Sequence, residues 1–291
     1  MEIQLGFIDQ YSNGYSTQLD KQLSTEEYNL FIKSTDELYN YENLKRLYDI
    51  LILNHNEFIK FVDDEKKMLF ENSLSIIGDK ENYYKHHLNL NRMFLNYLSS
   101  FRTLLDHTET IIKRKYEKES VESTKFKLLT NKIFDNYFAY RFFTKLRNYS
   151  QHCGIPIDEF EVSGTMIDEN RIKPEYKIEF SSSSLLTKYK DWGAIVSKDL
   201  QTKGDFSLFP LLEEMKLALN EFWISLISIF ENEIVEAIEY INTNAFHLRS
   251  PQSTVCIFSD IKRDDYGNMK YFTVNNIPFD IIDELLGNKN G

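Results

Sequence analysis

The sequence predicts a mainly α-helical fold with small β-hairpin additions in its C-terminal half. Long stretches carry apolar residues at intervals of three and four, which is the period of an amphipathic helix. Helix-breaking residues are scarce, with 10 Gly and 5 Pro among 291 residues. Hydrophobic residues make up 42% of the chain and aromatic residues 14%, so the chain can bury a substantial core.

The N-terminal segment, residues 1–80, is expected to be helical. Its helical pattern starts at Ser24 and continues to about residue 72. Ser24 and Glu27 have the spacing of a capping box, in which each side chain satisfies a free backbone N–H group at the start of a helix. The Gly-Asp pair at 78–79 then predicts a turn.

A pair of long helices is expected over residues 81–155. The first covers about 82–119 and the second about 124–152. The second should end where Gly154 and Pro156 follow it, because glycine favours a helix C-terminus and proline cannot continue a helix.

The C-terminal half adds strands to the helices. Alternating residues on both sides of positions 168–170 predict a two-stranded hairpin, which we assign to an insertion over 156–182. Helical patterns return over 183–250 and are expected to complete an antiparallel helical bundle. Residues 251–291 predict a second hairpin and a short closing helix.

The net charge of −11 argues against broad, nonspecific binding of nucleic acid, because a phosphate backbone would be repelled. Basic residues are nevertheless concentrated between positions 113 and 147, where ten Lys and Arg stand against four Asp and Glu. Ten minus four gives this segment a local charge of +6. It is either a solvated face or a surface that meets a phosphate backbone.

Targeting and cysteine patterns predict a cytoplasmic protein. The N-terminus lacks a basic region followed by an apolar run, so we expect no signal peptide, and the most apolar stretch, 222–230, is too short to cross a bilayer. Cys153 and Cys256 have neither a disulfide framework nor metal-ligand spacing. His86 and His87 are adjacent rather than four apart, which does not favour a shared metal ion. We therefore expect no membrane contact, metal or cofactor.

A polar stripe runs along the second helix of the pair. Spacings of four, three and four residues place Arg141, Lys145, Asn148 and His152 on one side of an ideal helix. Aromatic and leucine side chains occupy much of the remaining circumference, which indicates a helix buried on more than one side.

The first helix of the pair has a similar stripe, formed by Arg92, Asn96, Ser100, Thr103 and His107. We expect the two stripes to face each other. They then either line a wet groove or satisfy each other's hydrogen bonds, because unpartnered polar groups are costly to bury.

The end of the second helix carries groups that suit RNA cleavage. His152 lies in the last helical turn, and a histidine side chain can act as a general acid or base near neutral pH. The Arg147 guanidinium has a fork of donors that fits phosphate oxygens, and Asn148 can orient the histidine or the substrate. The sequence shows no glycine-rich phosphate loop and no carboxylate cluster for magnesium. RNA supplies its own nucleophile, the 2′-hydroxyl, so the protein needs to add only proton transfer and charge stabilisation.

Arg147 and His152 are separated by about 140° around an ideal helix, so they do not share a helix face. Either the last turn loosens before Gly154, or the two residues meet across a subunit interface. The nearly all-round apolar surface of this helix favours the second arrangement.

The stretch "RNYSQH" at 147–152 matches the R-x4–6-H signature of the HEPN superfamily, and "YRFFTKLRNYSQHCGIPI" resembles uncharacterised bacterial proteins that carry "LRNYxQHxGxPI". The resemblance implies a HEPN-type antiparallel helical bundle that dimerises and brings two copies of the motif into one cleft. Active members of the superfamily are metal-independent endoribonucleases, often in toxin–antitoxin or phage-defence systems. It therefore implies RNA as the substrate, a homodimer, and an antitoxin or other defence-system protein as a further partner.

The resemblance also implies roles for individual residues. Arg147 and His152 would be catalytic, and Asn148 would support them. The remaining polar residues of the two stripes would bind the substrate: Arg92, Asn96, His107, Arg141 and Lys145.

Two other functions remain open at this point. The chain is alternatively a non-catalytic HEPN module that binds RNA or a nucleotide. It is alternatively a helical interaction or scaffold protein, such as the partner of a toxin, in which the motif is part of the buried structure.

Overall fold

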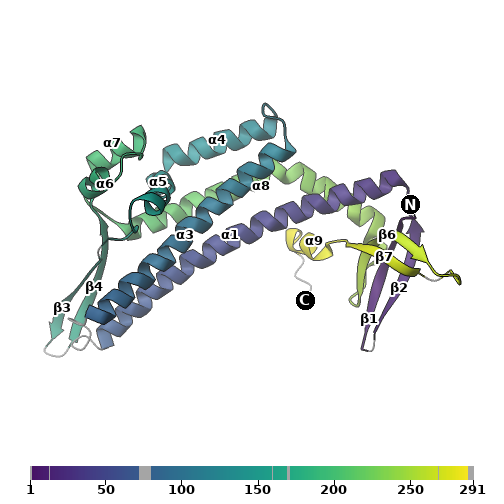
Figure 1. Cartoon of the computed structure of the whole chain (residues 1–291), viewed down its shortest axis with the longest axis horizontal. Coiled ribbons are helices and arrows are strands. Elements are labelled where there is room, and N and C mark those ends of the chain that lie inside the picture. The colour runs from purple at the N-terminus through teal and green to yellow at the C-terminus, as the bar shows by residue number, and fades with distance from the viewer. Residues whose placement is uncertain are drawn as a thin grey trace. The chain divides into compact units, whose positions relative to one another are not determined.

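The computed structural model describes residues 2–12, 14–71, 80–158, 160–168, 171–267 and 269–287 (Figure 1). It shows a mixed α/β protein, so the expected mainly α-helical, HEPN-type bundle is wrong. Long helices are present, but two antiparallel sheets accompany them. The chain divides into two compact units: unit 1 contains residues 1–45 and 230–291, and unit 2 contains residues 46–229.

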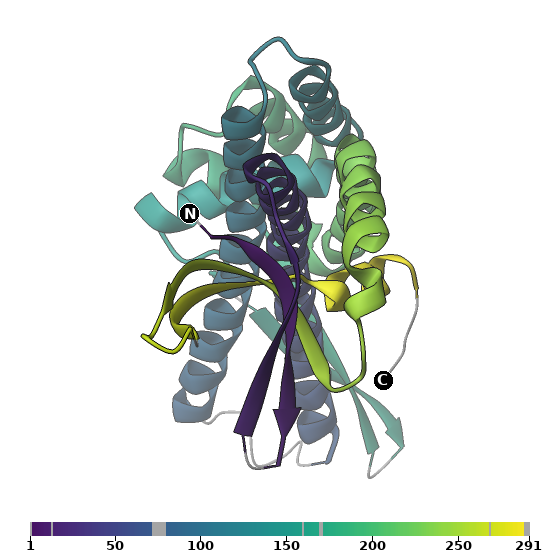
Figure 2. The same ribbon diagram turned by 90° about the vertical axis from the view of Figure 1, so that its right-hand side faces the viewer.

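Unit 1 contains a four-stranded antiparallel sheet in the order β2-β1-β6-β7 (Figure 2). The predicted C-terminal hairpin is confirmed as β6 (Ser253–Arg263) and β7 (Met269–Asn276). The other two strands of the sheet, β1 (Gln4–Tyr11) and β2 (Gly14–Gln22), lie in the N-terminal segment that was expected to be helical. Strand β2 is polar and largely exposed, so its sequence lacks the alternation that identifies a half-buried strand.

Gly6 allows β1 and β2 to approach each other at an irregular point of their pairing. The register shifts between Leu5 and Gly6. A Cβ atom at position 6 would lie 2.1 Å from the backbone oxygen of Gln18. Only glycine fits this β-bulge without moving the neighbouring strand.

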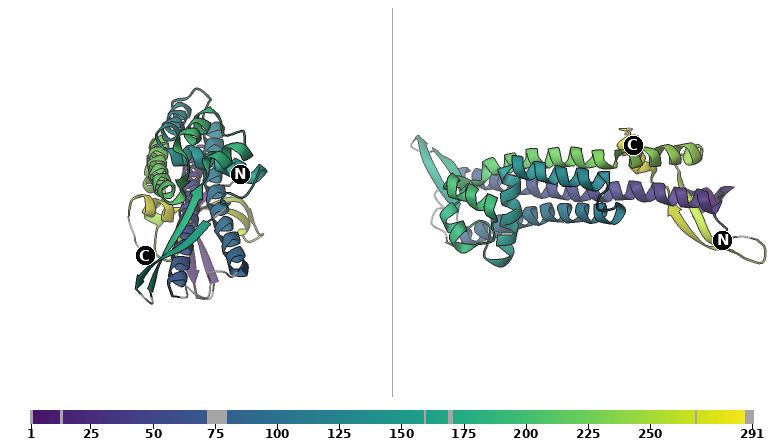
Figure 3. Two further views of the ribbon diagram at one scale, coloured as in Figure 1. Left: turned by 90° about the vertical axis from the view of Figure 1, so that its left-hand side faces the viewer. Right: turned by 90° about the horizontal axis from the view of Figure 1, so that it is seen from above.

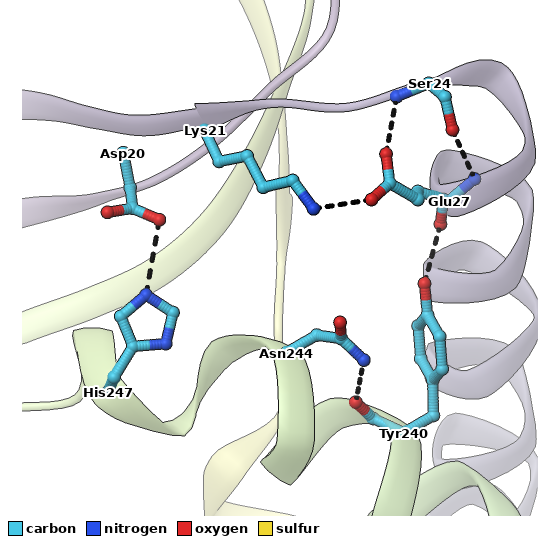
Figure 4. Close-up of polar contacts among 7 residues, drawn as sticks. All are labelled: Asp20, Lys21, Ser24, Glu27, Tyr240, Asn244 and His247. Carbon is cyan, nitrogen blue, oxygen red and sulfur yellow. Dashed lines mark hydrogen bonds and ion pairs between the residues drawn. The ribbon is translucent and has the colours of Figure 1, made fainter.

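Helix α1 (Thr25–Glu71) begins at the predicted capping box, which is confirmed (Figure 4). The Ser24 N–H donates to Glu27 Oε2 at 2.8 Å, and the Glu27 N–H donates to Ser24 Oγ at 3.1 Å. Lys21 of β2 pairs with the same carboxylate at 2.5 Å, and the Tyr240 hydroxyl donates to the Glu27 carbonyl at 3.2 Å. The cap therefore joins the start of α1 to a strand and to helix α8 (Leu208–Ala245) within unit 1.

The remainder of unit 1 is a single 3-10 turn, Phe246–Leu248, and the predicted closing helix, found as α9 (Phe279–Leu285). The ion pair between Arg249 and Asp283 connects the residue after this turn to α9.

We predict that Ser24→Ala lowers the free energy of unfolding by about 1 kcal/mol, because the Glu27 N–H then loses its acceptor. Urea denaturation of the full chain measures the change. Ser99→Ala is the control, since it replaces an exposed serine within a helix and should change the free energy by less than about 0.5 kcal/mol. Equal effects of the two substitutions would contradict the stabilising role of the cap.

Unit 2 contains the predicted helix pair in a modified form. The first helix is α3 (Lys80–Lys115), while the turn expected at 78–79 lies outside the described residues. The expected helix over 124–152 is in fact two helices, α4 (Val121–Asn136) and α5 (Phe138–His152). Tyr137 separates them with an extended backbone, φ −119° and ψ 112°.

The start of α5 is held by acidic side chains of α8. Glu214 accepts a hydrogen bond from the Phe138 N–H at 2.6 Å, and Glu221 accepts one from the Tyr137 hydroxyl at 2.7 Å. A carboxylate at a helix N-terminus satisfies a free N–H group and interacts favourably with the helix dipole. Sequence periodicity along 124–152 does not report such a partner, which is 76 residues away along the chain.

The rest of unit 2 lies beyond α5 in sequence. The predicted hairpin is confirmed as β3 (Phe160–Asp168) and β4 (Arg171–Phe180), and β5 (Phe206–Ser207) extends it to three strands. The helical pattern expected from residue 183 is divided into α6 (Ser182–Lys188) and α7 (Ala194–Lys203), and Gly193, with φ 78°, precedes α7. Figures 1 and 3 show β3, β4, α6 and α7 grouped at the end of unit 2 where α3 begins.

None of the helices in the described part of the chain combines the length and the apolarity needed to cross a membrane.

Candidate functional site

Helix α5 is buried on several sides, as its sequence predicts. Phe143 packs edge-on against Phe94 and Tyr97 of α3, with ring centroids 5.6 and 6.2 Å apart. Phe142, on a different side of α5, stacks on the fully buried Trp192, with ring centroids 5.8 Å apart. The helix is thus fixed between α3 and the segment that precedes α7.

The polar end of α5 is where this burial stops. The helix ends at His152, as predicted, and the Cys153 N–H donates to the Tyr149 carbonyl at 2.8 Å. Gly154 is needed for packing, since a Cβ atom there would lie 2.9 Å from the Tyr149 hydroxyl oxygen. His152 and Cys153 are exposed at this end.

A buried asparagine fixes the segment that follows α5. Asn91 of α3 is 4% exposed, and its side chain accepts from the Ile157 N–H at 3.0 Å and donates to the Ile157 carbonyl at 2.9 Å. His87 Nε2 lies 2.8 Å from the same carbonyl. These bonds satisfy buried backbone groups that would otherwise destabilise the fold, and they hold the end of α5 against α3.

We predict that Asn91→Leu lowers the free energy of unfolding by about 2–4 kcal/mol, because it leaves the buried N–H and carbonyl of Ile157 without this partner. Urea denaturation measures the loss. Asn96→Leu is the matched control on the exposed side of the same helix and should change the free energy by less than about 0.5 kcal/mol. A small effect at both positions would show that the Asn91 bonds contribute little.

The candidate catalytic residues occupy two different sides of α5. Asn148 is half-buried one turn before the exposed His152, on the same side of the helix. Arg147 lies in one row with Tyr140 and Phe143, which pack on α3. Among the contacts of the described residues, none joins Arg147 to His152.

Arg147 has one partner that the sequence did not reveal. Its Nη1 donates to Gln151 Oε1 at 2.5 Å, one helical turn further on. Its Nε is buried and has no hydrogen-bond partner within the described part of the chain. The guanidinium is therefore oriented along the helix toward its C-terminal end, with its buried Nε unsatisfied. The i to i+4 spacing of Arg and Gln is the sequence signal that predicts this contact.

The other basic residues of the α5 stripe have structural neighbours. Arg141 Nε pairs with Asp199 of α7 at 2.7 Å, and its Nη1 donates to the carbonyls of Phe134 and Asp135 at 3.1 and 3.2 Å. Arg141 thereby satisfies the C-terminal carbonyls of α4 and connects three helices. The aliphatic chain of Lys145 lies close to Gly193.

The expectation that the polar stripes of α3 and α5 face each other is wrong. The two helices meet through aromatic rings, as in the pairs Phe94–Phe143 and Phe101–Tyr140. The α3 stripe is on the opposite side of that helix, and four of its members are exposed: Arg92, Asn96, Thr103 and His107. The structure thus does not bring these residues to the end of α5.

A second polar cluster was not expected from the sequence. His86 of α3 lies between two other elements of unit 2, with its Nδ1 2.9 Å from Glu65 Oε2 of α1 and its Nε2 hydrogen-bonded to the Tyr176 hydroxyl of β4. Its ring stacks on Phe61 at 5.1 Å and meets Phe160 at 4.7 Å. The cluster attaches the β3–β4 hairpin to α1 and α3. Its three polar residues are far apart in sequence, so spacing does not predict it.

Burial changes the proton affinity of this cluster. It lowers the pKa of His86 to about 4, with a smaller contribution from neighbouring His87. Burial also raises the pKa of the Glu65 carboxyl, with a contribution from Asp64, and raises the pKa of the Tyr176 hydroxyl. Both histidine and carboxyl are therefore shifted toward their neutral forms.

We predict that His86 makes the fold less stable as the pH falls from about 6.5 to about 4. In this range His86 binds a proton in the unfolded chain but stays neutral in the folded chain, so protonation favours unfolding. Glu65 acts in the opposite direction, since the folded state keeps its proton at a higher pH. Urea denaturation should therefore compare Glu65→Gln with Glu65→Gln/His86→Phe. The single variant should lose stability more steeply over this interval, and parallel profiles would contradict the prediction.

Potential metal ligands are dispersed. Within the residues that the structure describes, no group of three or more His, Cys, Asp or Glu side chains is arranged to hold a metal ion. Cys256 is buried, and burial raises the pKa of its thiol to about 12, whereas Cys153 is exposed.

Comparison of the chain with protein-family models, with curated proteins and with solved structures found no match.

Proposed function

We propose that this chain is a metal-independent endoribonuclease of the kind that its "RNYSQH" motif resembles, with Arg147 and His152 as catalytic residues and Asn148 in support. The observation that carries the proposal is the C-terminal turn of α5. There an exposed histidine follows a half-buried asparagine by one turn, and an arginine with a buried, unsatisfied Nε directly precedes the asparagine.

The chemistry follows from these groups. A general base removes the proton from the RNA 2′-hydroxyl, and the 2′-oxygen attacks the adjacent phosphorus. The bond from phosphorus to the 5′-oxygen breaks, which leaves a 2′,3′-cyclic phosphate and a 5′-hydroxyl that takes up a proton. His152 suits the proton transfer, because an imidazole can act as a general acid or base and this one is exposed at the end of α5. The guanidinium of Arg147 suits the developing charge on the phosphate oxygens.

We propose that the working form is a homodimer. Arg147 shares its side of α5 with the rings that pack on α3, and His152 lies about 140° around the same helix. In a dimer, Arg147 of one chain can lie beside His152 of the other, although the two residues are on different sides of α5 within one chain. We also propose a cytoplasmic setting, where Cys153 would stay reduced, and a role in a bacterial toxin or phage-defence system with an antitoxin or similar protein as partner.

We predict that purified protein cleaves RNA in EDTA and leaves cyclic-phosphate ends, and that Arg147→Ala and His152→Ala each reduce the rate by about 100-fold or more. Gel analysis with end-group identification measures both. His247→Ala is the control, because it removes an exposed histidine of unit 1 that contacts Asp20, and it should leave the rate unchanged (Figure 4). DNA of the same sequence should stay intact, since it lacks the 2′-hydroxyl.

Unchanged cleavage by both active-site variants would show that the catalytic assignment is wrong. If the wild type does not cleave RNA, a second candidate function applies, a non-catalytic module that binds RNA or another protein. The contact of Arg147 with Gln151 favours this candidate, because it occupies a donor that catalysis would use. RNA binding without turnover, weakened by salt and by loss of the basic residues between 113 and 132, is its signature.

A further inference from the structure

A cavity of about 290 Å³ opens in unit 2 beside the last turn of α5. Its wall is built from α5, the segment after it, the end of β4 and helix α6. The Asn91–Ile157 bonds fix one side of it, because Pro156 and Asp158 line the cavity and flank Ile157. The cavity is distinct from the polar stripe on α5 and contains none of the proposed catalytic residues.

The apolar part of the wall is rigid. Tyr149 and Phe180 contribute to it and are 1% and 4% exposed. The ring of Tyr149 stacks on Trp192 at 5.8 Å, and Phe180 meets Phe142 edge-on at 5.2 Å. The cavity is therefore shaped before a ligand arrives, which lowers the entropic cost of binding.

The polar part of the wall leaves one carboxylate available. Asp158 is paired with Lys188, so these two charges largely cancel at the rim. Glu179 and Ser184 also line the cavity, and no side-chain hydrogen bond of either occurs within the described part of the chain. A ligand would thus meet an apolar surface, the free carboxylate of Glu179, the free hydroxyl of Ser184, and the Ser181 hydroxyl, which is bonded to Ser183.

These groups fit a guanine base. A carboxylate only accepts hydrogen bonds, and guanine is the RNA base whose Watson–Crick edge presents two neighbouring donors, at N1 and N2. Adenine and cytosine place an acceptor beside their amino group, and uracil places its N3 donor between two carbonyl oxygens. The volume is at the lower limit of small-molecule pockets, about 300 Å³, which suits one base rather than a whole nucleotide.

We propose that the cavity binds guanine, with Glu179 accepting from N1 and N2 and with Ser184 as a further hydrogen-bonding group. The guanine belongs to an RNA strand whose backbone passes the end of α5, since Tyr149 in the cavity wall precedes His152 by three residues on the same helix. This placement rests on the proposed function, while the recognition of guanine does not.

The test measures binding separately from cleavage. Fluorescence anisotropy follows the full-length protein with 2′-O-methyl oligoribonucleotides, which lack the nucleophile and cannot be cleaved by the proposed reaction. One probe carries a single guanine between uridine runs, and the other carries adenine at that position. We expect about tenfold or more tighter binding of the guanine probe. Glu179→Gln should abolish the preference, and Glu175→Gln, an exposed glutamate on the same face of β4 outside the cavity, should retain it.

Equal affinity of the wild type for the two probes, or an unchanged preference in Glu179→Gln, would overturn the proposal. Competition with GMP identifies the source of the base: displacement only by the oligonucleotide supports RNA, and equally effective displacement by GMP supports a free guanine nucleotide. A guanine preference without RNA cleavage in EDTA would refute the proposed nuclease and leave the guanine site intact. RNA cleavage without a guanine preference would support the proposed nuclease and refute the guanine site.

Discussion

The bidentate contact between Asn91 and the backbone of Ile157 anchors the segment that follows α5 to helix α3. A carboxamide presents a donor and an acceptor in one plane, so a single buried side chain can replace the strand that would otherwise pair with this residue. A carboxylate offers no donor and an ammonium no acceptor. The contact restricts Pro156, which is bonded directly to Ile157, and the start of β3, which follows Ile157 by three residues.

Electrostatics at the two ends of α5 agree with its burial. Glu214 occupies the N-terminal end, where the helix dipole is positive, and His152 occupies the C-terminal end, where it is negative. Between them the helix is enclosed by rings, so its rotation about its own axis is fixed by packing. For this reason the angular separation of Arg147 and His152 is a firm property of one chain.

The elements that could be predicted from the sequence are those determined by residues close to one another along the chain. The Ser24 capping box, both hairpins of the C-terminal half, α9 and the end of α5 at His152 follow from local spacing and from helix-stopping residues. The β1–β2 pair was not predicted, because β2 is polar and largely exposed, and because β1 has its second partner, β6, more than 200 residues away. The start of α5 is stabilised by Glu214, which accepts a hydrogen bond from the Phe138 N–H. Local periodicity does not predict this distant partner, so the separation of α4 from α5 was not predicted either.

The candidate site divides in the same way. The position of His152 and its angle to Arg147 follow from counting residues around a helix. The Gln151 contact lies one turn away and was within reach of the same reasoning. The packing of the aromatic sides of α3 and α5 against each other could not be predicted by counting residues, because a polar stripe can face either a neighbouring helix or solvent. The Glu65–His86–Tyr176 cluster needs three elements to be placed in space, and sequence spacing does not provide that.

The two cysteines differ in exposure, so a thiol reagent can label the end of α5 selectively. Cys153 is exposed directly after His152, whereas Cys256 is enclosed in the sheet of unit 1 with a thiol that stays protonated at neutral pH. A thiol-directed fluorophore or spin label therefore attaches beside the histidine in the native sequence. Distances between two such labels would report directly on how close the α5 ends of two associated chains come in solution.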